Sequence, residues 1–383
     1  TDACNGSCPQ CDMRKTNPFK RSRLAYDEIW KLMDGAVANG VESLSFTGGE
    51  VFMYEDELYE HIRYAVDAGI PLVRTGTNGF MFMNSDRASF ADDMKRMAER
   101  IRKTGLRNLW ISLDSAEDSL HEEMRGLPGV VAGMEKALPY FHAEGVYPAA
   151  NLGINRNTGG RGVIPQVMED EEAFYEAWVE SFSAFYRRIL DMGFTMTNCC
   201  YPMSIDPGEL DAIYGANSPE AITSFADAEK TVLFKALMDV IPKYRDKIRI
   251  FTPRASLYAL IEHYSGREDM SYPCRGGIDY FFVPASSGDT FPCGFRGADN
   301  LGKFYDLDVK AIPRHAFCKK CDWECFRDPS ELIGYLRDRY VGISFLNGQK
   351  KNGKSEEYKK LWQEDIAYYV KCDFFDGREP MKF

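Results

Sequence analysis

The sequence has 383 residues, enough for two domains or for one large α/β domain with an appendage. Hydrophobic residues make up 44% and charged residues 27%, the balance of a globular protein that buries a large core. The 58 acidic residues outnumber the 47 basic ones, and the net charge of −11 argues against general binding to nucleic acid. No run of about 18 apolar residues occurs, so no transmembrane helix is expected.

The first two hundred residues alternate between short apolar or β-branched runs and amphipathic helical stretches. Strands are expected at Val41–Thr47, Pro71–Thr77, Leu106–Asp114, Val146–Ile154 and Phe194–Cys200. Helices are expected at Ala25–Asn39, Glu55–Ala68, Phe90–Lys103, Leu127–Glu144 and Asp170–Met192. This alternation predicts an α/β fold with a parallel sheet, open or closed into a barrel. Its chemistry is expected at the carboxyl ends of the strands, and a first strand is expected ahead of Thr1.

The second half of the chain has a different character. Residues 205–272 are expected to form a helical linker, with its clearest helix at Pro219–Ile241 and a strand at Ile248–Phe251. Residues 273–383 are expected to form a small cysteine-rich domain, in which two apolar runs flank a turn at Ser286–Asp289. A charged loop at Lys350–Lys354 and a C-terminal helix at Ser355–Val370 complete it. Residues 1–204 then make up the core domain.

The eleven cysteines lie in clusters with short spacings, which favour metal binding over disulfide bonds in a chain of this length. Cys4, Cys8 and Cys11 form a C-x3-C-x2-C motif. Three such thiolates can hold three corners of a cubane iron–sulfur cluster and leave the fourth iron open. A zinc site completed by a distant residue is the alternative for this spacing alone.

Taken together, four motifs in order resemble the radical S-adenosylmethionine (radical SAM) superfamily over roughly residues 1–200. The cysteine motif is followed by Gly48-Gly49-Glu50 at the end of one predicted strand and by Thr77-Asn78-Gly79 at the end of the next. The sequence ISLDS at Ile111–Ser115 ends a third strand and precedes Arg125. The family usually has an aromatic residue before the third cysteine, where this chain has Gln10.

The resemblance implies a partial (β/α)6-type barrel that binds a [4Fe-4S] cluster and S-adenosylmethionine (SAM). Cys4, Cys8 and Cys11 would then bind the cluster. The residues implied to contact SAM are Gly48, Gly49, Glu50, Asn78, Ser112, Asp114, Arg125 and Asn151. One electron from the cluster would cleave SAM into methionine and a 5′-deoxyadenosyl radical, which abstracts hydrogen from an inert C–H bond.

Six further cysteines resemble the SPASM/twitch extension, which carries auxiliary iron–sulfur clusters in many radical SAM enzymes. Its opening is matched by the spacing of Cys274 and Cys293, whereas the later run is shorter than the full pattern. We therefore expect at least one auxiliary [4Fe-4S] cluster, which uses Cys274, Cys293 and two of the later trio. A zinc ribbon is the alternative. The cysteines that remain as candidate metal ligands are Cys318, Cys321, Cys325 and Cys372.

Cys199 and Cys200 end the strand at Phe194–Cys200, and strand alternation directs their side chains to opposite faces. Buried free cysteines usually act as small hydrophobic residues. The alternative is a thiol that gives a hydrogen atom to a substrate radical, and Tyr201 is a weaker candidate for the same task.

The sequence therefore predicts a radical SAM enzyme that acts on a small natural-product, sugar or nucleoside-like substrate. The expected outcome is dehydrogenation, epimerisation or bond formation. A ribosomal-peptide maturase is the alternative reaction class, and a non-catalytic iron–sulfur carrier is the alternative outside enzymes. A flavodoxin- or ferredoxin-type reductant and a cytoplasmic location follow from the resemblance, and neither nucleic acid nor a membrane is expected as a partner.

Overall fold

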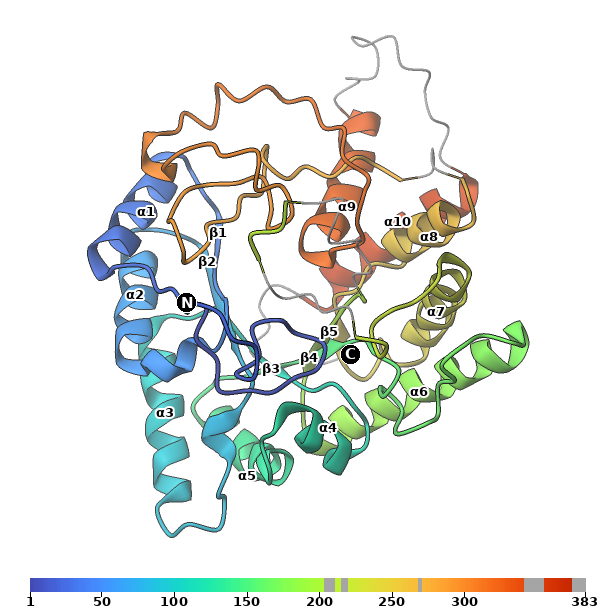
Figure 1. The fold of residues 1–383 in the computed structure, drawn as a ribbon, viewed down its shortest axis with the longest axis horizontal. Helices are drawn as coiled ribbons and strands as arrows, with labels where there is room; N and C mark the ends of the chain where they lie inside the picture. Colours follow the sequence, from blue (N-terminus) through green and yellow to red (C-terminus); the bar gives the residue numbers. More distant parts are fainter. Residues whose placement is uncertain (203–210, 215–219, 268–270, 341–354, 374–383) are drawn as a thin grey trace.

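The computed structural model describes residues 1–202, 211–214, 220–267, 271–340 and 355–373 (Figure 1). Six parallel strands form one sheet in the order β1-β2-β3-β4-β5-β6. The strands are β1 (Ser43–Phe46), β2 (Leu72–Thr77), β3 (Asn108–Ser112), β4 (Ala149–Gly153), β5 (Met196–Cys200) and β6 (Arg249–Ile250). The sheet is not closed, which confirms the predicted partial barrel of parallel strands.

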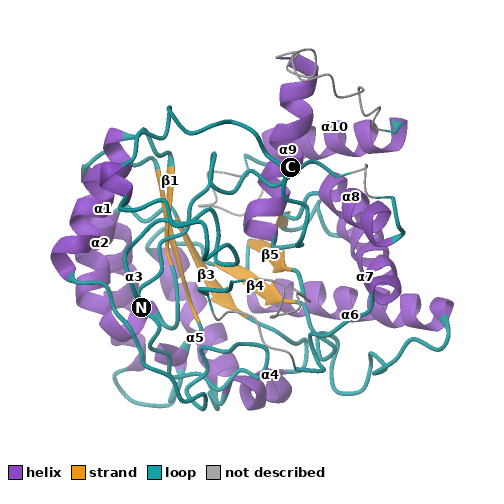
Figure 2. Ribbon diagram, turned by 45° about the horizontal axis from the view of Figure 1, so that its top comes forward, coloured by secondary structure: helices purple, strands orange, loops and turns teal. Residues whose placement is uncertain are grey.

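Helices surround the sheet on its outer side (Figures 1 and 2). The α-helices of the barrel are α1 (Tyr26–Ala38), α2 (Glu55–Asp67), α3 (Phe90–Thr104), α4 (Asp118–Arg125), α5 (Val130–Ala143), α6 (Glu171–Met192), α7 (Asp227–Val240) and α8 (Arg254–Tyr264). Short 3-10 helices are η1 (Val51–Tyr54), η2 (Phe80–Phe82), η3 (Ile241–Lys243) and η5 (Phe304–Asp306). The sequence pattern did not predict α4, whose eight residues are too few to show a clear helical period.

Residues 205–272 were expected to be a linker, but their described part continues the barrel. β6 pairs in parallel with β5, and α7 packs on both α6 and α8. The expected helix at Pro219–Ile241 begins at Asp227 in its described part, and the expected loop at Lys350–Lys354 lies outside the described residues.

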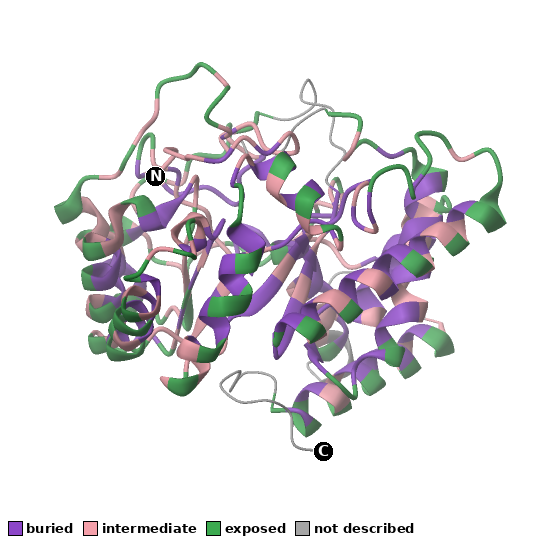
Figure 3. Cartoon of the chain, turned by 90° about the horizontal axis from the view of Figure 1, so that it is seen from below, coloured by how far each residue is buried: buried purple, intermediate pink, exposed green. Residues whose placement is uncertain are grey.

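The two faces of the strands differ in burial. Val73, Thr75 and Thr77 of β2 point toward the helices and are buried, whereas Arg74 and Gly76 face the inside of the sheet and are not. The same alternation holds in β3 and β4. Figure 3 shows the buried residues on the sheet and on the helix faces that meet it. The inner face of the partial barrel is therefore accessible to solvent, while the apolar core lies between sheet and helices.

The C-terminal region packs over the inner side with two long helices, α9 (Glu324–Tyr340) and α10 (Glu356–Lys371). The expected hairpin is present, since Phe282 and Phe291 exchange two backbone hydrogen bonds. The helix α9 was not predicted, and its first turn stands beside β5 (Figure 2). Within the described residues, no helix is long and apolar enough to cross a membrane.

Candidate active site

The first cysteine loop lies against the end of β1. The backbone N–H groups of Gly49 and Glu50 donate to the carbonyl oxygens of Thr1 and Ala3, each at 2.7 Å. A Cβ atom on Gly48 or Gly49 would stand 2.0 Å from one of these carbonyl oxygens, so only glycine permits the approach. The Gly-Gly pair therefore positions the segment that carries the cysteines.

Arg21 secures the same loop from its other side. Its guanidinium donates to the carbonyl oxygens of Asp2 at 2.9 Å, Met13 at 2.6 Å and Arg14 at 2.7 Å. Sequence reasoning missed this residue, because an arginine whose partners are backbone carbonyl groups leaves no motif.

The three thiols of the loop are close to one another and are all free. The sulfur atoms of Cys4 and Cys8 lie 3.6 and 3.5 Å from the position that a Cβ atom would take on Gly6. Burial raises the pKa of Cys11 to about 12, and the neighbouring thiols of Cys8 and Cys4 raise this pKa further. Such raised pKa values indicate that the thiolates need a cationic group such as an iron–sulfur cluster to compensate them.

Glu50 is a buried carboxylate beside this loop, only 2% exposed. Its oxygen atoms accept hydrogen bonds from the backbone N–H of Asn78 at 2.6 Å, the hydroxyl of Thr77 at 3.0 Å and the backbone N–H of Phe52 at 3.0 Å. Burial raises the pKa of Glu50 to about 7, against the effect of these hydrogen bonds. The Asn78 side chain in turn donates to Asn5 of the cysteine loop at 2.8 Å.

Asp114 and Arg125 form a buried ion pair on the opposite side of the cysteines, with N–O distances of 2.7 and 2.8 Å. Gln10 donates to the same Asp114 oxygen at 2.7 Å, and its own side-chain oxygen is buried with no hydrogen-bond partner among the described residues. The residue that departs from the family pattern is thus part of the site. The carbonyl oxygen of Arg125 also accepts a hydrogen bond from the backbone N–H of Ser7.

The inner face of the barrel continues the site away from the cysteine loop. Ser112, Asn151 and Cys200 all lie on this face, and the Cys200 sulfur stands 3.4 Å from the Asn151 side-chain oxygen. Cys199 points the other way, toward Tyr186 of α6, and Tyr201 is buried with its hydroxyl 3.1 Å from Asp328 of α9. Of the three proposed hydrogen donors, only Cys200 therefore faces the inside of the barrel.

Tyr214 links the two parts of the site. Burial raises its pKa, and the next largest contribution comes from the thiol of Cys11, with smaller ones from Cys325 and Cys200. Its ring also stacks on Trp323, with ring centroids 5.6 Å apart. The first cysteine loop and the inner-face thiols consequently border the same tyrosine, a residue that carried no recognisable signal in the sequence.

A second set of four thiols, which we call the auxiliary set, gathers in the C-terminal region: Cys274, Cys293, Cys318 and Cys321. Cys274 and Cys318 are paired backbone to backbone, with an N–O distance of 2.7 Å. Burial raises the pKa of Cys274, Cys293 and Cys321, and the Cys318 thiol contributes to each of these increases. Aromatic side chains pack around the set, namely Phe295, Trp323, Phe326, Tyr280 and Phe282.

The geometry does not bring Cys325 and Cys372 to the auxiliary set. Cys325 is the second residue of α9, so the helix turns it away from the loop of Cys318 and Cys321 and toward Cys200. Cys372 follows α10 and is buried beside Tyr368 and Arg249. Proximity to Cys318 and Cys321 in the sequence suggested Cys325, whereas Cys372 was a candidate that stands alone in the sequence; the helices decide the direction of both.

Across the described ranges, no three His, Cys, Asp or Glu side chains converge closely enough to hold one metal ion. Four thiolates around zinc would stand about 3.8 Å apart, given a bond of about 2.3 Å in tetrahedral geometry. The described residues therefore show no preformed site for a single zinc ion.

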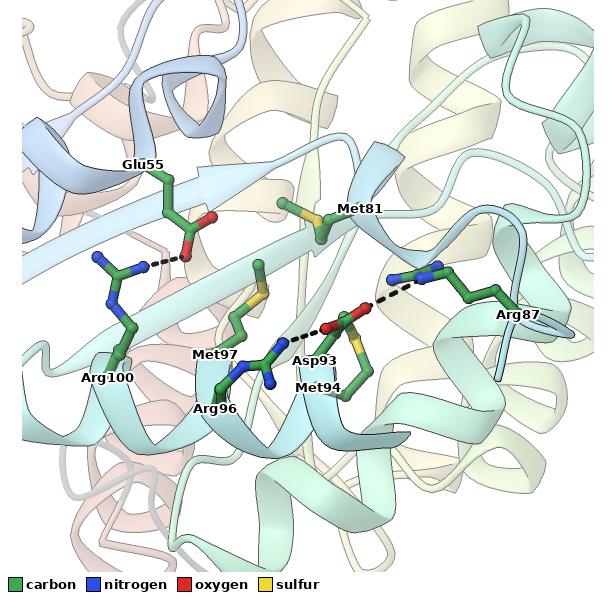
Figure 4. A pocket seen from close by; sticks show the side chains of 8 residues that line it. All are labelled: Glu55, Met81, Arg87, Asp93, Met94, Arg96, Met97 and Arg100. Carbon is green, nitrogen blue, oxygen red and sulfur yellow. Dashed lines mark hydrogen bonds and ion pairs between the residues drawn. The ribbon is translucent and has the colours of Figure 1, made fainter. Parts of the chain in front are cut away.

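A pocket of about 460 Å³ lies outside this site, beside α3 (Figure 4). Its charged residues are paired with one another, as in the contacts of Arg87 and Arg96 with Asp93 and of Arg100 with Glu55. Because these charged side chains are paired with one another, they offer little to a charged ligand, and we assign the pocket no role.

Comparison with known proteins agrees with this geometry. The family model described as "Radical SAM superfamily" matches residues 1–173. The AdoMet-dependent heme synthase of Methanosarcina barkeri is 24% identical over 339 residues, which cover 87% of this chain and 84% of that protein. The enzyme of the same name from Oleidesulfovibrio alaskensis is 25% identical, with 87% and 76% covered. A GTP 3',8-cyclase of Xanthomonas campestris is 30% identical over 36% of this chain and 39% of its own length.

A parallel partial barrel with three thiols at the carboxyl end of its strands defines the chain as an enzyme of the iron–sulfur class. The domain that residues 1–173 form matches the radical SAM superfamily. Members of this superfamily use a [4Fe-4S] cluster and SAM, and they need a substrate and an external reductant.

Proposed function

We propose that this radical SAM enzyme cleaves SAM reductively and removes a hydrogen atom from an unactivated C–H bond of a small molecule. The observation that carries this proposal is the three-thiol loop of Cys4, Cys8 and Cys11 beside the buried charges of Glu50 and Arg125. A set of three protein ligands leaves one corner of a cluster for SAM, and the fixed charges beside it suit the amino and carboxylate groups of methionine.

A [4Fe-4S] cluster held by Cys4, Cys8 and Cys11 would supply the single electron that reductive cleavage of SAM requires. In this proposal the chain's own residues bind and orient. Glu50 is held by three donors, and the carboxylate oxygen that meets Asn78 retains capacity to accept from the methionine amino group. Arg125, fixed by Asp114, offers its remaining N–H groups to the methionine carboxylate.

Further along the inner face, Ser112, Asn151 and Asn198 offer neutral hydrogen-bonding groups to the ribose and to the substrate. The side-chain amide of Asn198 donates to Asn151 at 2.5 Å, and this contact fixes the orientation of both. Gly48 and Gly49 have a positioning role, because they admit the cysteine loop.

The auxiliary set is proposed to hold one further [4Fe-4S] cluster through Cys274, Cys293, Cys318 and Cys321. Four thiols in an aromatic surrounding support complete ligation by protein, which suits electron storage or shaping of the substrate pocket. This ligand set contains two of the three later cysteines and omits Cys325 and Cys372.

For the substrate we propose a tetrapyrrole of the heme type, since two relatives named AdoMet-dependent heme synthase align with 87% of this chain. A flavodoxin- or ferredoxin-type protein is the proposed reductant. Eleven free thiols and oxygen-sensitive clusters support a reducing location such as the cytoplasm.

The test is an anaerobic assay of purified, iron-reconstituted protein with SAM and dithionite, in which 5′-deoxyadenosine is quantified. We expect slow formation by the wild type, acceleration by a tetrapyrrole carboxylic acid, and no formation by a Cys4/Cys8/Cys11→Ala variant. The Cys199→Ala variant is the matched control, because this thiol faces the helices. A wild type that carries iron at the loop and forms no 5′-deoxyadenosine with any tetrapyrrole would contradict the proposal.

A further inference from the structure

Glu324, the first residue of α9, places a carboxyl group among the inner-face thiols. Its side chain is 7% exposed, and one oxygen accepts a hydrogen bond from the Cys325 thiol at 3.3 Å. The Cys200 thiol donates a hydrogen bond to Asn151 at 3.4 Å and lies near the same carboxyl group, which contributes to its raised pKa. The other oxygen has no hydrogen-bond partner in the part of the chain that the structure describes. Two thiols from distant parts of the sequence therefore meet at one carboxyl group.

This cluster faces the inside of the barrel. Cys200 lies on the inner face of β5 and contacts Asn151, a residue implied to serve SAM. The Cys325 side chain is exposed even though Arg74, Cys200 and Glu324 are its neighbours, which indicates that it borders a solvent-filled space within the barrel. The thiols of Cys11, Cys325 and Cys200 all contribute to the raised pKa of Tyr214, so the two thiols lie in the same part of the molecule as the first cysteine loop.

Both thiols keep their hydrogen atoms near neutral pH. Burial raises the pKa of Cys200 and of Cys325, and the nearby carboxyl group of Glu324 raises both further. A protonated thiol is the form that can release a hydrogen atom, whereas a thiolate is the form that binds metal.

A buried carboxyl group with an unsatisfied oxygen costs stability, and a purely structural role would be served better by apolar residues. Cys199 shows the contrast: the same residue type, one position earlier, points into the helix layer and contacts Tyr186 and Thr252. Cys200 in contrast lies near the Glu324 carboxyl group on the side where a substrate would lie.

We propose that Cys200 and Cys325, held by Glu324, form a hydrogen-atom donor pair for a carbon radical in the barrel. The inference rests on the proposed radical chemistry and deepens it. The S–H bond of one thiol breaks and a C–H bond forms, which leaves a sulfur radical. That sulfur then takes the hydrogen atom of the second thiol, and a thiol in solution gives one hydrogen atom to the second sulfur, which restores the pair and leaves the radical on the solution thiol. Such a pair makes a redox-neutral outcome, such as epimerisation, available to this enzyme.

The first test separates this role from metal binding. Iron and sulfide are measured in reconstituted Cys325→Ala, Cys200→Ala and Cys321→Ala variants. We expect the first two to retain the wild-type iron content and Cys321→Ala to lose the iron of the auxiliary set. A loss of iron from Cys325→Ala equal to that from Cys321→Ala would overturn the proposal.

The second test needs only SAM and dithionite in D2O, where thiol hydrogens exchange and carbon-bound ones do not. Without substrate, the carbon radical is the 5′-deoxyadenosyl radical itself. We expect wild-type protein to form singly deuterated 5′-deoxyadenosine, the single variants to lose most of this label, and the Cys200→Ala/Cys325→Ala double variant to lose it entirely. Cys199→Ala is the control and keeps the label.

The role of Glu324 is to position the thiols, so Glu324→Gln, which still accepts hydrogen bonds, should restore the label that Glu324→Ala loses. Formation of 5′-deoxyadenosine with equal label in the wild type and the double variant would overturn this inference and leave the proposed function intact. No 5′-deoxyadenosine from any variant or the wild type, in spite of loaded iron and added tetrapyrrole, would instead overturn both.

Discussion

The two cysteine sets of this chain lie in opposite chemical surroundings. The first loop has three thiols, and its neighbours are buried polar groups, above all Glu50, Asp114 and Arg125. The auxiliary set has four thiols, and its neighbours are rings, with Trp323 packed against both Phe295 and Phe326.

The comparison shows that the number of thiols and the polarity of their surroundings change together: the set of three lies among charged groups and the set of four among aromatic rings. Burying a charge costs free energy unless a partner of opposite charge lies beside it. Next to a cluster that lacks a fourth protein ligand, the amino and carboxylate groups of SAM would be such partners. An apolar surrounding excludes water from a fully ligated cluster and tunes its potential.

The largest expected effect comes from Gly49→Ala. Its new Cβ would stand 2.0 Å from the Ala3 carbonyl oxygen, which is backbone and cannot move without the cysteine loop. We expect loss of the first cluster, about four of about eight iron atoms, and loss of 5′-deoxyadenosine formation. Iron analysis and electron paramagnetic resonance of the reduced protein measure this.

Cys293→Ala is the converse control for Gly49→Ala. We expect it to remove the auxiliary iron and to leave the first cluster in place. If each variant lost all iron, the two sites would be coupled, and the contrast between them would fail.

A smaller effect is expected from Asp114→Asn, which leaves Arg125 buried without its carboxylate. Breaking one partner of a buried ion pair costs about 3–5 kcal/mol of unfolding free energy. Denaturant unfolding of the reconstituted protein measures the change. Glu123→Gln is the matched control, because the Arg161–Glu123 pair is 62% and 67% exposed and should contribute at most about 1 kcal/mol. Equal losses in the two variants would contradict the importance of burial at this site.

The smallest expected effect is a pH dependence from His121. Burial lowers its pKa to about 3, and its Nδ1 accepts a hydrogen bond from the backbone N–H of Asp114. The unfolded chain therefore binds a proton below pH 6.5 that the folded chain does not take up until about pH 3. Stability from this group is present above pH 6.5 and falls by about 2 kcal/mol by pH 5.

His121→Gln removes this titration, so its unfolding free energy should change less between pH 7 and pH 5 than that of the wild type. Parallel pH profiles for the two proteins would count against a buried neutral His121.

The fold was largely predictable because its signal is local. Both kinds of signal can be recognised from consecutive residues. Examples are the alternating burial of the strand Leu72–Thr77 and the 3.6-residue period of the helix Phe90–Thr104. The elements that were missed lacked this signal: α4 is short, and the polar, cysteine-containing sequence of α9 concealed a helix.

The residues of the candidate site that belong to a sequence motif were predictable. Residues that contact parts of the chain far away in sequence were not. Gln10 acts through its contact with Asp114 and Arg21 through several backbone carbonyl groups, and no spacing in the sequence reveals either. Cys325 was grouped with Cys318 and Cys321 because the three are close in sequence. The start of α9 separates them, since a helix rotates successive side chains by about 100°.

The sequence by itself determined the class of chemistry, because three cysteines at this spacing and a Gly-Gly-Glu turn are local requirements of cluster and SAM binding. Only the tertiary structure decided which thiols share a site. Cys200 and Cys325 are 125 positions apart and meet at Glu324 because β5 and α9 pack side by side. Cys199 and Cys200 are adjacent in sequence, but their side chains point to opposite faces of the sheet because side chains alternate along a strand.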